Sequence, residues 1–137
     1  MPICAAVLTM AAVAPPIDDA AVIALVMVDR YADGADNADD VIPGHPRRFQ
    51  GGDLRGLRAR LPWLQALGVS HVWMTPLHAQ IPTLVGAGDT ATAGFHGYWP
   101  ADFTAIDPHF GTVADLRALA DDAAAKDIGL VLDVVTN

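Results

Sequence analysis

The chain has 137 residues, of which 53% are apolar and 18% charged, and its formal net charge is −8. This length fits one ordinary domain and excludes two large ones. The negative charge argues against a nucleic-acid partner, because phosphate binding needs a basic surface. No stretch reaches the roughly 18 consecutive apolar residues that a membrane span needs, and the single cysteine, Cys4, excludes an internal disulfide.

The N-terminal sequence MPICAAVLTMAAVAPP allows two interpretations. Its apolar run ends in Ala-Val-Ala before two prolines, as in the core and cleavage site of a secretory signal, but no basic residue stands at its front. Residues 1–16 are therefore interpreted as a signal peptide or a disordered N-terminus, and residues 17–137 as the folded domain. The signal-peptide interpretation predicts a secreted or periplasmic protein.

The first predicted elements are a strand and a helix joined by a loop. Residues 20–29 are a continuous apolar run, which predicts a strand covered on both faces. Residues 30–53 contain Asp-Gly, Pro-Gly and Gly-Gly pairs and are predicted to be a loop. A helical period follows, with leucines three or four residues apart: Leu54, Leu57, Leu61, Leu64 and Leu67. Asp53 suits its N-cap and Gly68 its end, while Pro62 predicts a kink or a split into two short helices.

The second half repeats this order. Residues 69–77 are predicted to be a buried strand, and residues 78–107 a long loop that contains the aromatic sequence GFHGYW. Thr112 is predicted to cap a second helix, with Asp115 completing a capping box, and residues 128–135 are the third strand. This alternation is typical of an α/β fold with a parallel sheet. In such folds, ligands bind in the loops at the carboxyl ends of the strands.

The first loop carries a cluster of four carboxylates: Asp33, Asp36, Asp39 and Asp40. Like charges this close repel one another unless they are solvated or a cation neutralises them. Calcium suits such a loop, because it takes six to eight oxygen ligands in flexible geometry. Asn37, Asp53 and the carbonyl of Gly51 could add ligands. The alternative is an acidic surface loop that is only solvated.

The sequence GFHGYW, residues 94–99, places three aromatic residues around His96. Aromatic rings pack on the apolar C–H faces of sugars, and a histidine can hydrogen-bond sugar hydroxyls. A carbohydrate site is therefore one interpretation of this loop. The other is a small hydrophobic cluster beneath a long loop.

Three further features have structural interpretations. His71 is interpreted as a strand histidine, and His109 as part of the turn before the second helix. Asp29 and Arg30, at the end of the first strand, are interpreted as a structural ion pair.

Asp133 and Asn137 close the third strand, where polar side chains of a parallel sheet form sites. Ordinary solvation of a strand end is the alternative. A nucleotide-binding fingerprint is missing, since neither G-x-G-x-x-G nor a Walker lysine motif follows any predicted strand.

Taken together, five segments resemble the α-amylase family of glycoside hydrolases, in particular its bacterial α-amylase and cyclodextrin-glucanotransferase branch: VMVDRYADG, FQGGDLRGL, LGVSHVWMTPL, FHGYWPADFTAIDPHFGT and LVLDVVTN. They follow the family's order and spacing over residues 22–137. The resemblance implies an incomplete (β/α)8 TIM barrel, of which residues 17–137 form three strands and two helices. It also implies a retaining enzyme that acts on α-1,4-glucans such as starch, glycogen or maltodextrin.

The resemblance also implies roles for individual residues. His96 and Tyr98 match residues that contact the sugar at the cleavage point, and Asp133 matches an aspartate that supports this site. Asn137 matches a calcium ligand between the barrel and its loop domain. A second calcium site of this branch matches four residues: Asp33, Asp39, Gly51 and Asp53. Ala35 departs from that pattern, so Asp36, Asn37 and Asp40 stand as alternative ligands.

In this family the nucleophile, the acid/base and a third aspartate lie on strands beyond the last segment matched here. The chain by itself is therefore expected to lack hydrolytic activity and to need the remaining strands of the barrel. Two rival hypotheses stand beside this one. The first is a non-catalytic module that binds α-glucan or calcium. The second is a small, independent α/β domain of flavodoxin-like kind.

Overall fold

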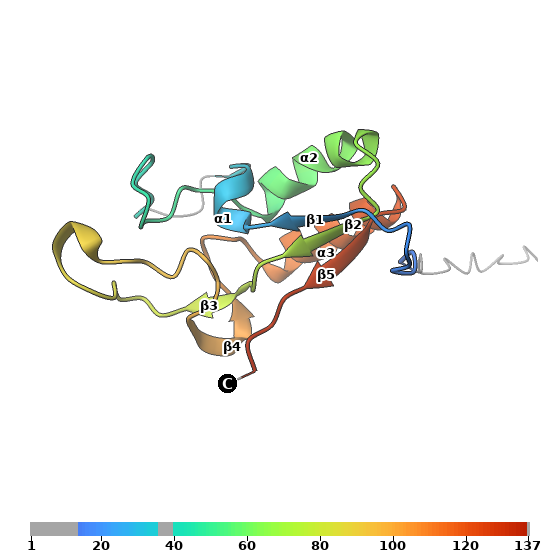
Figure 1. Cartoon of the computed structure of the whole chain (residues 1–137). Coiled ribbons are helices and arrows are strands. Elements are labelled where there is room, and N and C mark those ends of the chain that lie inside the picture. The colour runs from blue at the N-terminus through green and yellow to red at the C-terminus, as the bar shows by residue number, and fades with distance from the viewer. Residues whose placement is uncertain (1–13, 36–39, 137) are drawn as a thin grey trace, which may run out of the picture.

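A computed structural model describes residues 14–35 and 40–136 (Figure 1). Its centre is a parallel three-stranded sheet in the order β1-β2-β5, formed by β1 (Ile23–Val26), β2 (His71–Met74) and β5 (Gly129–Leu132). The three predicted strands are thus confirmed, with shorter bounds. After β1 the chain turns at once into a short helix, α1 (Val28–Tyr31), which lies partly within the predicted first strand.

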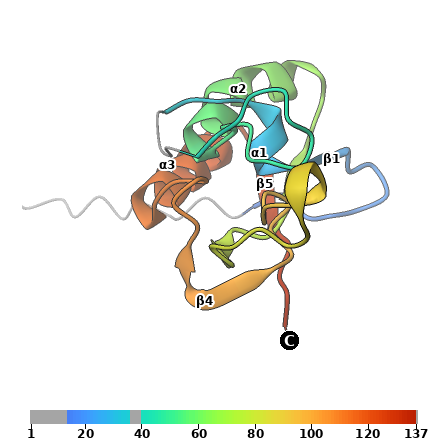
Figure 2. The ribbon, with the colours of Figure 1, turned by 90° about the vertical axis from the view of Figure 1, so that its left-hand side faces the viewer.

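Two helices cover one face of this sheet: α2 (Leu54–Ala66) and α3 (Val113–Ala124). They pack beside each other, as Figure 2 shows. Four of the five leucines that the sequence spacing selected are buried: Leu54, Leu57, Leu61 and Leu64. The fifth, Leu67, is the C-cap of α2 and is 58% exposed, so its place on the apolar stripe was predicted wrongly. The four buried leucines meet Val72 and Met74 of β2, both fully buried, and Leu119 of α3 in one core.

The opposite face of the sheet is open. Leu25 is 63% exposed and Trp73 is 41% exposed, whereas their strand neighbours Val26 and Met74 are buried. Because side chains alternate between the faces of a strand, the apolar residues on this second face have no covering layer among the described residues. The prediction that the first strand is covered on both faces is therefore wrong for this part of the chain. This is the face that a closed barrel fills with side chains from its other strands.

Both long helices begin as their caps predict. The Asp53 side chain accepts a hydrogen bond from Gly56 N at the start of α2. Thr112 and Asp115 form a complete capping box at the start of α3. Pro62 lies inside an uninterrupted α2, so the predicted split is wrong. Its ring is exposed, and water can therefore hydrate the helix carbonyl that the proline leaves without an amide donor.

The predicted loop 78–107 contains regular structure that the sequence did not reveal. It forms a two-stranded antiparallel sheet from β3 (His78–Gln80) and β4 (Pro100–Ile106), with a short 3₁₀ helix, η1 (Gly88–Thr90), between them. The pairing has two register shifts and depends on contacts from outside the strands. The buried carboxylate of Asp107 accepts a hydrogen bond from Gln80 N at 2.8 Å, and its own amide donates to Leu77 O.

Several predictions fall outside the described residues. These are the proposed leader, apart from residues 14–16, and four candidate ligands: Asp36, Asn37, Asp39 and Asn137. Within the described ranges, none of the helices has the length and apolar character needed to cross a membrane.

The packing of α2 gives a first prediction. Leu57→Ala removes a side chain that is fully buried between the helix and the sheet, and we expect the free energy of unfolding to fall by about 2–5 kcal/mol. Leu67→Ala is the matched control, because Leu67 is 58% exposed at the end of the same helix, and its cost should be within about 0.5 kcal/mol. Urea denaturation measures both. Equal losses would contradict the packing of α2 described here.

Candidate functional site

Two of the predicted sugar-site residues meet at the carboxyl end of the sheet. The Tyr98 hydroxyl donates a hydrogen bond of 2.6 Å to Asp133 Oδ2. Tyr98 lies in the loop between β3 and β4, whereas Asp133 follows β5, so the fold joins two segments that are distant in sequence. The bond raises the pKa of Tyr98, because ionising the phenol would place a second negative charge beside the carboxylate. It also fixes a ring that is 45% exposed.

His96 completes this cluster. Its Nδ1 accepts a hydrogen bond from the backbone amide of Tyr98 at 3.0 Å, so in the neutral ring the proton is on Nε2. Partial burial lowers the pKa of His96 and favours that neutral form. The ring stacks on Tyr98 with a centroid distance of 5.9 Å, and its edge meets Trp99 at 4.4 Å. The cluster therefore combines an exposed aromatic face with a hydrogen-bond donor.

Gln80 holds the loop that carries these residues. Its side-chain amide donates to the carbonyls of Gly97 and His78, and its Oε1 accepts from Trp99 N at 2.7 Å. Gly97 adopts a positive φ of 88°, and a Cβ there would collide with the Pro76 carbonyl. The second glycine of GFHGYW is thus required by the close approach of the loop to the end of β2.

The described candidate calcium ligands form two groups, Gly51 with Asp33 and, separately, Asp53. A Cβ on Gly51 would lie 3.4 Å from Asp33 Oδ2, so Gly51 and the Asp33 carboxylate are neighbours. Asp53 is 1% exposed, and it accepts hydrogen bonds from Gly56 through Oδ1 and from Gly34 and Ala35 through Oδ2. Ala35, the departure from the family pattern, thus contributes its amide to the loop.

The described part of the acidic loop fits a cation only partly. Oxygen donors of this kind suit calcium, and the Asp53 carboxylate has one lone-pair site, on Oδ1, beyond its three hydrogen bonds. Among the described residues, however, no group of three or more acidic, histidine or cysteine side chains is arranged to hold a metal ion.

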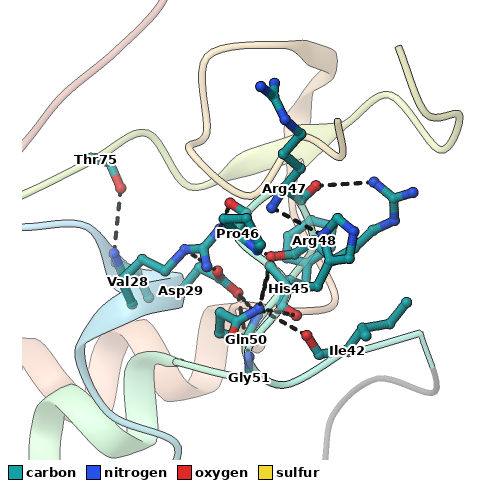
Figure 3. Close-up of polar contacts among 12 residues, drawn as sticks. Val28, Asp29, Ile42, His45, Pro46, Arg47, Arg48, Gln50, Gly51 and Thr75 are labelled. Carbon is teal, nitrogen blue, oxygen red and sulfur yellow. Dashed lines mark hydrogen bonds and ion pairs between the residues drawn. The ribbon is translucent and has the colours of Figure 1, made fainter. Parts of the chain in front are cut away.

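Asp29 and Arg30 anchor the loop of residues 42–51, and Figure 3 shows Asp29 beside Gln50 and Gly51 of this loop. The buried Asp29 Oδ1 accepts from Gln50 N at 2.8 Å and from Gly51 N at 3.4 Å, and Oδ2 lies 3.0 Å from Arg30 Nε. Burial raises the pKa of Asp29, although these amides and the Arg30 charge oppose the shift. The predicted structural ion pair is therefore confirmed, and it holds Gly51 in place beside Asp33.

The contacts of His109 were missed by sequence reasoning. Its Nδ1 lies 2.7 Å from Asp107 Oδ1 and its Nε2 lies 2.6 Å from Asp40 Oδ1, while the ring stacks on Phe49 with a centroid distance of 3.5 Å. Burial alone would lower the pKa of His109, but the two carboxylates raise it. The turn position was predicted, yet nothing in the local sequence indicates a partner as distant as Asp40.

His71 behaves as the strand histidine that the sequence predicted. It is 2% exposed, and its ring nitrogens lie 2.9 Å from Ser70 Oγ and 3.0 Å from Pro15 O. Its ring therefore contacts both the start of β2 and the segment that leads into β1.

The Tyr98–Asp133 hydrogen bond gives a second prediction. Asp133→Asn removes the negative charge beside the phenol, so the pKa of Tyr98 should fall toward its ordinary value. Ultraviolet titration of tyrosinate absorbance measures this. The chain has only one other tyrosine, Tyr31, so Tyr98→Phe identifies which signal belongs to Tyr98. An unchanged pKa of Tyr98 in Asp133→Asn would show that the bond does not form in solution.

Comparison with known proteins supports the family suggested by the motifs. The family model for the α-amylase catalytic domain matches residues 25–137. The α-amylase of Streptomyces lividans is 47% identical over 89 residues, which cover 65% of this chain and 10% of that protein. The periplasmic α-amylase of Escherichia coli K12 is 37% identical over 126 residues, which cover 85% of this chain and 19% of that protein.

A solved structure supports the same family. The crystal structure of the γ-cyclodextrin glucanotransferase from alkalophilic Bacillus clarkii has a TM-score of 0.78 and 29% identity, over 84% of this chain and 18% of that one. The chain thus spans between 10% and 19% of the lengths of these three proteins. The sheet and helices described here are consistent with part of the TIM barrel of such enzymes. The chain belongs to the α-amylase family, and residues 25–137 match its catalytic domain.

Proposed function

We propose that the protein acts on α-1,4-glucans by hydrolysis or transfer with retention, and that this chain supplies the sugar-binding surface formed by His96, Tyr98 and Asp133. The observation that carries the proposal is the 2.6 Å hydrogen bond between Tyr98 and Asp133. It immobilises an aromatic ring that is 45% exposed at the carboxyl end of the parallel sheet, where ligands bind in α/β folds.

The chemistry of the cluster suits a glucose unit. A glucose ring has an apolar C–H face that can pack on the exposed face of Tyr98, while its hydroxyls need polar partners. His96 offers Nε2–H, because its Nδ1 is occupied by the Tyr98 amide. Asp133 orients the phenol and keeps it protonated, since the pKa of Tyr98 is raised. The site thus binds and orients a sugar without itself breaking a bond.

Cleavage requires further groups. Retaining glycosidases use two carboxylates about 5 Å apart, one as nucleophile and one as acid/base. The family resemblance assigns neither role to a residue of this chain. We therefore propose that the 137-residue chain by itself binds glucan without hydrolysing it, and that the remaining barrel strands supply the carboxylates.

Binding and cleavage can be tested on the same protein. We expect maltotriose to bind in isothermal titration calorimetry, and Tyr98→Ala to weaken binding by about tenfold, which corresponds to about 1.4 kcal/mol. Trp63→Ala is the matched control, because Trp63 is an aromatic residue that is 56% exposed in α2, outside the cluster, and it should leave the affinity unchanged. Release of reducing sugar from soluble starch should be undetectable.

The possible outcomes separate the hypotheses. Reducing sugar released by the pure 137-residue chain would overturn the proposal that it cannot cleave glucan. A folded protein without affinity for maltotriose would reject the sugar site and favour an independent α/β domain. Binding without cleavage agrees with the proposal. A non-catalytic module would give the same result, and it would differ only by staying inactive after the remaining barrel strands are added.

We also propose that calcium binds the acidic loop through Asp33, Asp39, Gly51 and Asp53, and that Asn137 contributes to a separate calcium site. The proximity of Gly51 to the Asp33 carboxylate supports the first site. Bound calcium would neutralise the clustered carboxylates and tie this loop to Asp53 at the start of α2. Export of the protein, predicted from residues 1–16, remains a proposal of the same kind.

The first calcium site gives a prediction about thermal stability. Calcium should raise the midpoint of unfolding, because a ligand at 100 times its Kd stabilises a folded protein by about 2.7 kcal/mol. Asp33→Asn should remove most of this rise. Asp89→Asn, an exposed carboxylate in η1, should leave it intact. Differential scanning calorimetry with calcium or a chelator measures all three proteins, and an equal rise in all of them would exclude Asp33 as a ligand.

A further inference from the structure

We propose that Arg30 is a positioning residue that sets the geometry of the sugar-contacting loop, residues 94–99, through Phe95. That this loop contacts sugar rests on the proposed function. The effect of Arg30 on the position of His96 does not depend on ligand binding. This effect also gives a second role to a residue that would otherwise serve only as the partner of Asp29.

The guanidinium of Arg30 makes three polar contacts through two of its nitrogens. Its Nη2 donates to Pro46 O and to Arg48 O, each at 3.0 Å, and its Nε lies 3.0 Å from Asp29 Oδ2. Figure 3 labels all three partners, of which Pro46 and Arg48 belong to the loop of residues 42–51 and Asp29 follows β1. With three anchors of this kind the plane of the guanidinium is fixed, and the side chain is only 26% exposed.

The guanidinium also lies over an aromatic residue of the loop 94–99. Arg30 Cζ is 3.9 Å from the centroid of the Phe95 ring, within the range of a cation–π contact. The edge of Phe95 in turn meets His96, with ring centroids 5.3 Å apart and planes at 72°. His96 accepts the Tyr98 amide and stacks on the Tyr98 ring. A continuous set of contacts therefore runs from Arg30 to both sugar-contacting residues.

The backbone reinforces the same connection. Ala93 N donates to Arg47 O at 2.9 Å, and the Arg48 guanidinium reaches Ala91 O. The residues that precede GFHGYW are thus bound to the loop that Arg30 anchors. The anchor itself, Asp29, is 1% exposed, and it also accepts the amides of Gln50 and Gly51. A shift of the Arg30 side chain would therefore be transmitted to His96 through Phe95.

Lysine cannot replace arginine in this position. An ammonium group keeps the charge opposite Asp29, but it lacks the planar group that can lie over Phe95 while donating to two carbonyls and forming an ion pair with a carboxylate. We therefore expect Arg30→Lys to resemble Arg30→Met in its effect on His96, although it retains the positive charge.

The test follows His96 in the ligand-free protein. The imidazole nitrogens are observed by NMR as a function of pH, with the His96 signals identified by their loss in His96→Gln. Arg30→Met and Arg30→Lys should raise the pKa of His96 toward its ordinary value and move the Nδ1 shift, because the ring becomes more hydrated and loses the Tyr98 amide. Maltotriose affinity should fall by about five- to tenfold. The matched control is Arg58→Met, an arginine paired with Asp122 far from this loop in the fold, which should change neither quantity.

A double-mutant cycle with Phe95→Leu asks whether Arg30 acts through Phe95. Phe95→Leu alone leaves the Asp29–Arg30 pair intact and should reproduce the change in His96. Adding Arg30→Met should then have little further effect on His96, since contacting residues are not additive. This comparison separates positioning from a general loss of stability, and Phe95→Leu serves by itself if Arg30→Met does not fold.

The inference is overturned if the pKa and Nδ1 shift of His96 stay unchanged in Arg30→Met, or in Phe95→Leu where the former does not fold. Additive effects of the two substitutions on His96 would overturn the route through Phe95. If the parent protein does not bind maltotriose, the proposed sugar site fails, whereas the His96 spectra still decide the role of Arg30.

Discussion

The parallel register of β1, β2 and β5 is the constraint on which the other features depend. It brings the carboxyl ends of all three strands to one edge of the sheet. Asp29 and Arg30 follow β1, the loop with His96 and Tyr98 comes after β2, and Asp133 follows β5. Residues that are distant in sequence therefore meet because each follows a strand, and the hydrogen bond between Tyr98 and Asp133 is the direct result.

The buried charge of Asp29 imposes a second constraint. A carboxylate without partners in the protein interior would cost several kcal/mol, so the loop of residues 42–51 must pass close enough to supply two amides. Arg30 then compensates the charge while donating to the same loop. This arrangement explains how a segment rich in glycine and proline, with little regular structure, can still hold Gly51 beside Asp33.

Local signals account for what could be predicted from the sequence. The caps Asp53 and Thr112 define helix starts through contacts within three residues, and these are visible in the chain itself. The pairing of β3 with β4 was not visible, because it depends on the Asp107 carboxylate reaching Gln80 from outside both strands. Family motifs predicted His96, Tyr98 and Asp133 as site residues but not their mutual contacts. The stacking of Arg30 on Phe95 joins two motifs that carry no local sign of each other.

The cluster of His96, Tyr98 and Asp133 lies beside the open face of the sheet. Gly129 pairs with His71 and Val131 pairs with Trp73, so alternation along the strand directs Asp133 to the same side as these residues. The amide of Asp133 still donates to Met74 O, which continues the ladder of β5 to this point. Asp133 and Tyr98 therefore stand at the rim of the uncovered face. In the proposed function, strands that cover this apolar surface would also bring the catalytic carboxylates to the same edge of the sheet.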